Sequence, residues 1–202
     1  MTFSSAFYAI VDPLAGHEPV ALAEIFLARG VRLLQLRLKR VEGGEFLAVA
    51  TRIAELSRLA GALFIVNDRL DIALLSGAGG VHLGQTDLPL AAARRLAPTD
   101  FVIGISTHDL AQARAAEAGG ADYIGFGPIY PGGAKRTVAG QGLERLREIR
   151  QAVGLPIVAI GGIVEATLPA VIAAGASAGA MISDVVNAPD LDAKVARLLS
   201  IR

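Results

Sequence analysis

The sequence contains no cysteine among its 202 residues. Disulfide bonds, thiolate metal sites and thiol nucleophiles are therefore excluded. A chain without cysteine also fits the cytoplasm, where we expect the protein to reside. Tryptophan is absent too, and aromatic residues make up only 5% of the chain, so the sequence offers no evident platform for stacking nucleic-acid bases.

An excess of charge of one sign is also missing. Lys and Arg together number 19, as do Asp and Glu, so the formal net charge is zero. A neutral chain gives no electrostatic signature for nucleic acid or an anionic membrane. No apolar run reaches the roughly 18 residues of a membrane span, and residues 1–7 lack a signal-peptide pattern. We therefore expect small-molecule partners, with any anionic ligand held by a local cluster of cations.

Short apolar runs alternate with longer segments of helical spacing. In one such segment Phe46, Val49, Ala50 and Ile53 recur every three or four positions, as on one face of a helix. Strands that alternate with helices are typical of parallel βα units. The expected strands are Ala6–Val11, Arg32–Leu38, Leu63–Asn67, Gly80–Leu83, Phe101–Ser106, Tyr123–Gly127, Pro156–Ile160 and Ala178–Ser183.

This alternation fits either a closed barrel or an open doubly wound sheet. No GxGxxG motif follows the first expected strand, where a dinucleotide-binding sheet would carry one. Glycines such as Gly79 and Gly119 end helical segments just before strands, in a regular pattern. Eight units of about 25 residues suit a compact barrel. We therefore predict an α/β fold, a single (β/α)8 TIM barrel that forms one domain over residues 1–202.

Polar residues alternate with leucines at the end of the second expected strand and just beyond it. Because strand side chains alternate faces, Gln35, Arg37 and Lys39 share the face that looks into the barrel. Two inward cations are unfavourable unless anions pair with them. Those anions are either barrel aspartates, in internal ion pairs, or the oxygens of a bound phosphate or diphosphate. We favour the bound anion, because Arg and Lys both suit phosphate oxygens.

Two aspartates follow the next two strands. Asp68 comes directly after the third strand and Asp87 shortly after the fourth, so both should lie at the carboxyl end of the barrel, where function resides in this fold. Carboxylates next to a phosphate site suit Mg²⁺, which binds through one or two carboxylates and substrate phosphates. The alternative is that either aspartate only caps the helix that follows. We predict a Mg²⁺ site.

The remaining strand ends add hydroxyl groups, glycines and a long loop. Ser106 could donate to a phosphate oxygen, whereas His108 is either a base or a loop residue and His82 lies in mid-strand, where we expect a structural role. Residues 127–137 form a long, glycine-containing loop that we interpret as a lid. Gly161-Gly162 and the eighth strand suit a second phosphate site. Two anion sites in one barrel mouth indicate two phosphorylated substrates or one bisphosphate.

Six segments carry motifs that occur in the same order in one enzyme family. They are Gln35-Leu36-Arg37-Leu38-Lys39, Val66–Arg69, Gly80–Asp87, Gly104–His108, Ala121–Pro131 and Ile160–Ile163. Taken together, these segments resemble the thiamine phosphate synthase family over nearly the whole chain. Gly161-Gly162 alone would fit many phosphate-binding barrels.

The resemblance implies a Mg²⁺-dependent transferase of thiamine biosynthesis. It would condense hydroxymethylpyrimidine diphosphate with thiazole phosphate, or carboxythiazole phosphate, to thiamine phosphate and release pyrophosphate. In the family the carbon–oxygen bond breaks first, and the thiazole nitrogen then attacks a pyrimidine carbocation. Stabilisation of the leaving diphosphate then matters more than a general base. The sequence does not fix the oligomeric state, and a homo-oligomer is compatible with it.

The resemblance also implies a role for each site residue. The residues that would hold the pyrimidine diphosphate are Gln35, Arg37, Lys39 and Asn67. The residues that would bind Mg²⁺ are Asp68 and Asp87. The residues that would hold the thiazole phosphate are Gly162, Ile182 and Ser183. The residues that would contact the leaving diphosphate are Ser106 and Lys135, which count as catalytic together with Arg37.

Two other functions stay open, because the chain departs from the family pattern. The loop Gly132-Gly133-Ala134 replaces the usual threonines before the lysine, and Asp184 stands where the family has an apolar or small residue. One alternative is the related thiazole tautomerase, which isomerises carboxythiazole phosphate and uses a histidine at the position of His108. The other is a non-catalytic paralogue that binds a phosphate ligand. The synthase is favoured by the retained residues Arg37, Lys39, Asp68, Asp87 and Lys135.

Overall fold

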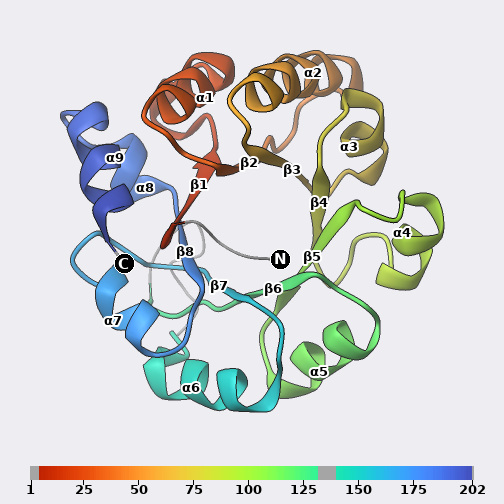
Figure 1. Ribbon diagram of the computed structural model, residues 1–202, viewed down its shortest axis with the longest axis vertical. Helices are drawn as coiled ribbons and strands as arrows, with labels where there is room; N and C mark the ends of the chain where they lie inside the picture. The colour runs from red at the N-terminus through yellow and green to blue at the C-terminus, as the bar shows by residue number, and fades with distance from the viewer. Residues whose placement is uncertain (1–4, 132–139, 202) are drawn as a thin grey trace.

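The computed structural model describes residues 5–131 and 140–201, and this part of the chain forms a closed barrel of parallel strands (Figure 1). Each strand pairs with the next along the chain, and the pairing of the last with the first closes the barrel. This confirms the predicted (β/α)8 fold. The strands are β1 (Phe7–Val11), β2 (Leu33–Leu36), β3 (Leu63–Asn67), β4 (Gly80–Leu83), β5 (Val102–Thr107), β6 (Tyr123–Phe126), β7 (Ile157–Ala159) and β8 (Ala178–Met181).

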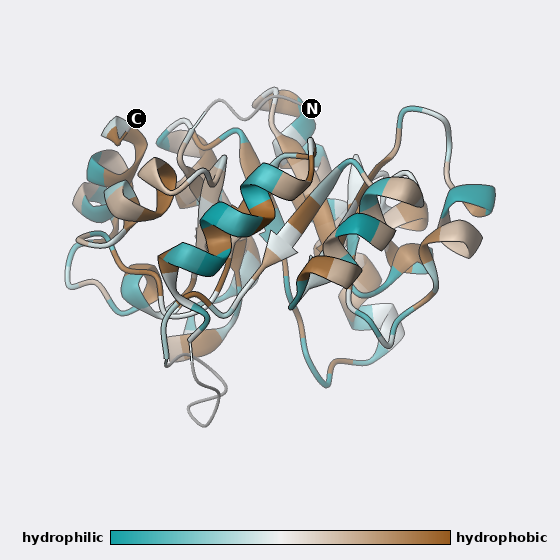
Figure 2. Cartoon of the chain, turned by 90° about the horizontal axis from the view of Figure 1, so that it is seen from below, coloured by the Kyte–Doolittle hydropathy of each residue, from teal (hydrophilic) through white to brown (hydrophobic). Residues whose placement is uncertain are grey.

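Helices surround the barrel (Figure 1). Hydrophilic and hydrophobic residues lie side by side along them (Figure 2), as expected for helices that cover a sheet on one face and meet water on the other. None of the helices in the described ranges has the length and apolar character that crossing a membrane requires. They are α1 (Pro19–Ala28), α2 (Gly43–Leu59), α3 (Leu70–Ser76), α4 (Leu90–Leu96), α5 (Leu110–Ala118), α6 (Gly142–Ala152), α7 (Leu168–Ala173), α8 (Ser183–Val186) and α9 (Leu191–Ser200), with a short 3-10 helix, Leu14–Gly16, after β1.

The strand alternation separates two buried layers. Leu34 and Leu36 of β2 belong to the large apolar layer between the barrel and the helices, together with Phe26 of α1. Gln35, between the two leucines, faces the barrel interior, where it contacts Tyr8. A smaller apolar cluster, which includes Ile65 and Val158, fills the interior. The inward face predicted for Gln35 is therefore confirmed.

Strands β6 and β7 end one residue earlier than the sequence indicated, and β2 and β8 end two residues earlier. The ladder between β2 and β3 stops at Leu36, which pairs with Val66, so Arg37 and Leu38 leave the sheet. Strand β8 ends at Met181, because Ser183 begins the short helix α8. The differences at β2 and β8 place Arg37, Ile182 and Ser183 beyond the strands, among the segments that follow their carboxyl ends.

Candidate active site

The carboxyl ends of the strands, with the segments that follow them, form what we call the barrel mouth. All the predicted site residues in the described ranges belong to it. Those within strands are Gln35, Asn67 and Ser106, and those just beyond a strand are Arg37, Lys39, Asp68, Asp87, Gly162, Ile182 and Ser183. Lys135 and the loop Gly132-Gly133-Ala134 lie outside the described residues.

Two ion pairs hold the cations that follow β2. Arg37 pairs with Asp12, the residue directly after β1, at 2.5 Å, and Lys39 pairs with Asp68 after β3. The internal ion pairs that the sequence left as an alternative are therefore present. They do not exclude anion binding, because a guanidinium has five N–H donors and an ammonium three. The Lys39 side chain is also 50% exposed, so it can turn toward a ligand.

Asp12 is a site residue that the sequence analysis missed. It is buried, and its Oδ1 accepts a hydrogen bond of 3.0 Å from the Leu14 N–H while Oδ2 holds Arg37. The Arg37 N–H in turn donates to the Val11 carbonyl at 2.8 Å. Arg37 is thus held both at its backbone N–H and at its guanidinium. The available signal was an aspartate directly after a buried strand, the same signal that identified Asp68.

The two aspartates proposed for the metal sit on adjacent strand ends. Asp68 adopts a left-handed backbone (φ 65°), and its N–H donates to the His82 carbonyl of β4 at 2.8 Å. Asp87 closes a turn, because its carboxylate accepts a 2.6 Å hydrogen bond from the Gly84 N–H. Neither caps a helix: α3 has Arg69 at its N-cap and α4 has Pro89. The helix-cap alternative is therefore wrong for both.

The donor set of these two residues fits Mg²⁺. Carboxylate oxygens are the ligands that this ion prefers, and it commonly binds one or two of them together with substrate phosphates. In the residues that the structure describes, no group of three or more His, Cys, Asp or Glu side chains comes together as a complete metal site. A diphosphate would therefore have to supply part of the coordination, with Asp68 and Asp87 as the protein ligands.

Ser106 lies at the end of β5 against a buried histidine. Its Oγ is 2.8 Å from Nε2 of His82, and its carbonyl accepts a 2.6 Å hydrogen bond from Gln85. Nδ1 of His82 is 2.9 Å from the Tyr123 hydroxyl. Burial lowers the pKa of His82 to about 4, so the ring is neutral near pH 7. His82, for which we expected a structural role, therefore contacts the hydroxyl of Ser106, a residue predicted to be catalytic.

His108, two residues after Ser106, forms a hydrogen bond with the segment that follows the next strand, β6. Its Nδ1 lies 2.7 Å from the carbonyl oxygen of Gly127, and its N–H donates to Gln112 at 2.8 Å. Because a carbonyl oxygen only accepts, Nδ1 is the donor, and a lone pair on Nε2 belongs to the neutral form of the ring. His108 therefore links β5 to the segment after β6, and Nε2 is the nitrogen through which it could act as a base.

Gly161 and Gly162 occupy a crowded turn after β7. Both have positive φ, of 87° and 67°. A Cβ on Gly162 would lie 2.8 Å from the Tyr130 carbonyl oxygen, and one on Gly161 would lie 2.5 Å from Cβ of Pro128. The segment after β6 also bonds here, from the Ile129 N–H to the Ile160 carbonyl at 2.8 Å. Packing alone thus requires these glycines, and their role in phosphate binding stays a prediction.

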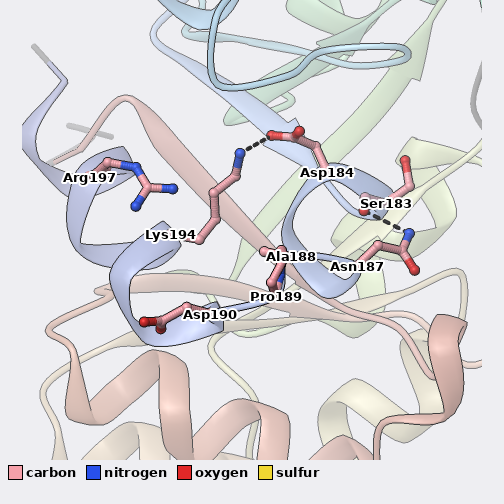
Figure 3. A pocket seen from close by; sticks show the side chains of 8 residues that line it. All are labelled: Ser183, Asp184, Asn187, Ala188, Pro189, Asp190, Lys194 and Arg197. Carbon is pink, nitrogen blue, oxygen red and sulfur yellow. Dashed lines mark hydrogen bonds and ion pairs between the residues drawn. The ribbon is translucent and has the colours of Figure 1, made fainter.

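The segment after β8 faces a cavity of about 490 Å³ (Figure 3). Ile182 precedes α8 and Ser183 is its first residue, so both residues predicted for the thiazole phosphate lie where β8 ends. The neighbouring Asp184 is directed to Lys194 of α9, which donates to it at 2.7 Å, and it also accepts from the Glu165 N–H at 2.9 Å. Its negative charge is therefore matched within the protein.

Comparison with known proteins identifies the family. A family model described as "Thiamine monophosphate synthase" matches residues 7–185. The thiamine-phosphate synthase of Methanoculleus marisnigri is 48% identical over 189 residues, which cover 92% of this chain and 90% of that protein. The thiamine-phosphate synthase of Moorella thermoacetica is 44% identical over 197 residues, covering 96% and 94%.

Solved structures agree with this comparison. Thiamine phosphate pyrophosphorylase from Pyrococcus furiosus superposes with a TM-score of 0.90 at 34% identity, covering 98% of this chain and 95% of that one. A 3-hexulose-6-phosphate synthase superposes at 0.77 with 21% identity and shares the fold alone. The extent of the family match and the identity to its members show that this chain belongs to the thiamine monophosphate synthase family.

Proposed function

We propose that the chain is a Mg²⁺-dependent transferase that condenses hydroxymethylpyrimidine diphosphate with thiazole phosphate, or carboxythiazole phosphate, and releases pyrophosphate. The observation that carries the proposal is the pairing of Arg37 with Asp12 and of Lys39 with Asp68, at the carboxyl ends of the neighbouring strands β1, β2 and β3. Membership of the family supports the transferase class, and curated relatives of similar length carry the name thiamine-phosphate synthase.

Diphosphate binding would use cations that the protein already holds in place. Arg37 is anchored through one guanidinium nitrogen on Asp12 and can direct its other donors to phosphate oxygens. Lys39 would exchange Asp68 for a phosphate oxygen. Asn67, the last residue of β3, would contribute an amide contact. Gln35 of β2, whose Nε2 already donates to Tyr8, would contribute through its second N–H. The negative charge of the substrate is then met by fixed positive charge.

The chemical step requires stabilisation of charge that develops on the leaving group. The bond between the pyrimidine methylene carbon and the diphosphate oxygen would break, with the electron pair passing to oxygen, and the thiazole nitrogen would then form the new bond to carbon. Arg37, Lys39 and Ser106, with Lys135, would stabilise the departing diphosphate. No side chain has to remove a proton, which fits the neutral, buried state of His82.

Mg²⁺ would be held by Asp68 and Asp87 together with the diphosphate. When bound, the ion supplies positive charge that neutralises the diphosphate oxygens. Transfer of Lys39 from Asp68 to a phosphate oxygen would release that carboxylate for the ion. Ligand and metal binding would therefore support each other through one side-chain movement.

The thiazole phosphate would bind across the mouth, at Gly162, Ile182 and Ser183. Backbone N–H groups of such loops after strands seven and eight commonly bind phosphate in this fold. We place the reaction in the cytoplasm, in keeping with the absence of cysteine. Assembly as a homo-oligomer stays a prediction.

The purified chain tests the function directly. Incubated with Mg²⁺, the pyrimidine diphosphate and thiazole phosphate, it should form thiamine phosphate and pyrophosphate in equal amounts. Arg37→Gln should lower kcat/KM on the order of 100-fold. The matched control is Arg29→Gln, because Arg29 pairs with Asp192 in an exposed contact, and it should leave the rate unchanged. No product under any metal condition contradicts the proposal. Isomerisation of carboxythiazole phosphate without condensation would support the tautomerase, with His108 as its base.

A further inference from the structure

Lys194 of α9 is a buried cation beside the predicted thiazole phosphate site. Its ammonium contacts the carboxylate of Asp184 at 2.7 Å and that of Glu165 at 2.9 Å. Asp184 directly follows Ser183, and Glu165 belongs to the segment after β7 that contains Gly161-Gly162. One ammonium therefore joins the two segments that we expect to bind the phosphate.

The Asp184 carboxylate is directed away from the predicted phosphate contact. It accepts a 2.9 Å hydrogen bond from the Glu165 N–H in addition to its contact with Lys194. In Figure 3 the Asp184 side chain points to Lys194, whereas the Ser183 side chain points elsewhere. Both Ser183 and Lys194 line the cavity of about 490 Å³. The carboxylate is thus bound within the protein while Ser183 stays available to a ligand.

The Lys194 ammonium and the Glu165 carboxylate are both charged near pH 7. Burial lowers the pKa of Lys194, but hydrogen bonds to Asp184 and Glu165 more than offset this effect, so that the pKa lies above its ordinary value. Hydrogen bonds from Arg197 and then Lys194 lower the pKa of Glu165 to about 2. Near neutral pH, Lys194 is therefore a permanent positive charge at a fixed position.

Without a cation beside it, Asp184 would repel the phosphate. A phosphate bound at Ser183 lies one residue from Asp184, and adjacent Cα atoms are only about 3.8 Å apart. Exposed charges act on each other over about 10 Å at 0.1 M salt, so an uncompensated carboxylate at this position would weaken phosphate binding. Among the described residues, the one cation that pairs with Asp184 is Lys194.

We infer that Lys194 is a positioning residue for the thiazole phosphate, because it holds the Asp184 carboxylate and neutralises its charge, so that the segments after β7 and β8 can bind the anion. The inference rests on the proposed function for the identity of that anion. It gives Lys194 no contact with the substrate and no part in the bond-breaking step. Its effect is therefore on the affinity for one of the two substrates.

The KM values of the two substrates test this inference. Lys194→Met removes the charge from an unbranched side chain and should raise the KM for thiazole phosphate on the order of tenfold, with little change in kcat or in the KM for the pyrimidine diphosphate. Arg197→Gln is the matched control, because it removes the same charge from the same helix but from a side chain that pairs with Glu165. It should change that KM by less than about twofold. A similar rise in both KM values, or an equal effect of Arg197→Gln, overturns the inference.

Removal of the Asp184 charge should reverse the effect. In the Lys194→Met background, Asp184→Asn should return the KM for thiazole phosphate to within about threefold of the original value, because the asparagine oxygen still accepts from the Glu165 N–H but carries no charge. A double variant as weak as Lys194→Met indicates a merely structural role and overturns the inference. Should Lys194→Met fail to fold, Asp184→Asn alone decides: an unchanged or lower KM supports the inference, and a rise of about tenfold overturns it.

Direct binding separates this inference from the proposed function. Isothermal titration of the intact chain with thiazole phosphate measures the Kd without turnover, and the variants should change the Kd in the same pattern as the KM. Binding in this pattern without formation of thiamine phosphate supports the inference and overturns the proposed function. Normal condensation with an unchanged Kd in Lys194→Met overturns the inference and leaves the proposed function in place. No binding of thiazole phosphate by the unaltered chain overturns both.

Discussion

Arg37 owes its position to a single carboxylate, that of Asp12. The Asp12 side chain is 11% exposed and that of Arg37 is 29% exposed, so this pair is more shielded from water than the Arg29–Asp192 pair, whose side chains are 46% and 53% exposed. Removal of one partner from a shielded pair leaves the other charge without compensation. Asp12 therefore matters for the direction of the guanidinium as well as for stability.

We predict that Asp12→Asn impairs both properties. The asparagine oxygen can still accept from the Leu14 N–H, but it cannot hold Arg37 with a charge. The free energy of unfolding should fall by about 1–3 kcal/mol, measured by urea denaturation. The KM for the pyrimidine diphosphate should rise, or kcat fall, on the order of tenfold. Asp192→Asn, which breaks the exposed pair, is the control and should change stability by less than about 1 kcal/mol. Equal effects of the two variants contradict the prediction.

At the scale of the elements, the sequence predicts strands well where the apolar runs end sharply. The bounds of β3 and β4 agree with the expectation, because Asp68 and Gly84 interrupt their apolar patterns. Alternation also placed Gln35 on the inward face. The register between strands, by contrast, cannot be read from one strand alone. That register brings Asp12 to Arg37 and unites Tyr8 with Tyr123, so these contacts could not be predicted.

Helix α9 is fastened to the barrel by a cluster of charges. Lys194, whose side chain is only 9% exposed, donates to Glu165 after β7 at 2.9 Å and to Asp184 of α8. Arg197, one turn further along α9, donates to Glu165 at 2.8 Å. Hydrogen bonds from Arg197 and then Lys194 lower the pKa of Glu165 from 4.5 to about 2. Three segments beside the mouth are joined in this way.

We predict that this cluster stabilises the fold in a pH-dependent manner. Because the pKa of Glu165 is lower in the folded chain, its contribution is fully present above about pH 4.5 and is lost as the pH falls toward 2. Glu165→Gln should therefore destabilise the chain by about 1 kcal/mol near pH 6. In denaturation curves this difference should shrink steadily between about pH 4.5 and pH 2.5. Glu144→Gln is the control, because Glu144 is 87% exposed. A pH-independent difference for Glu165→Gln would contradict the assignment.

At the scale of the whole molecule, closure of the barrel brings charged side chains together at one end, a clustering that the overall composition does not show. The net charge is zero, yet parallel strands bring Arg37, Lys39, Asp68 and Asp87 to one end. Pairing of β1 with β8 adds Asp12 and Ser183 to the same mouth. Residues from the start and the end of the chain thus meet around one site, so occupation of that site should stabilise the entire barrel.

We predict that Mg²⁺ and pyrophosphate stabilise the chain together. A ligand that binds only the folded state at about 100 times its Kd adds about 2.7 kcal/mol to the free energy of unfolding, which raises the Tm by several degrees. If Asp68 and Asp87 hold the ion against the diphosphate, either component alone should raise the Tm less than the two together, and a chelator should remove the joint increment. Asp87→Asn should abolish that increment while Asp192→Asn keeps it. A joint increment that survives in Asp87→Asn contradicts the proposed role of this carboxylate, because Mg²⁺ favours charged carboxylate ligands over a neutral amide.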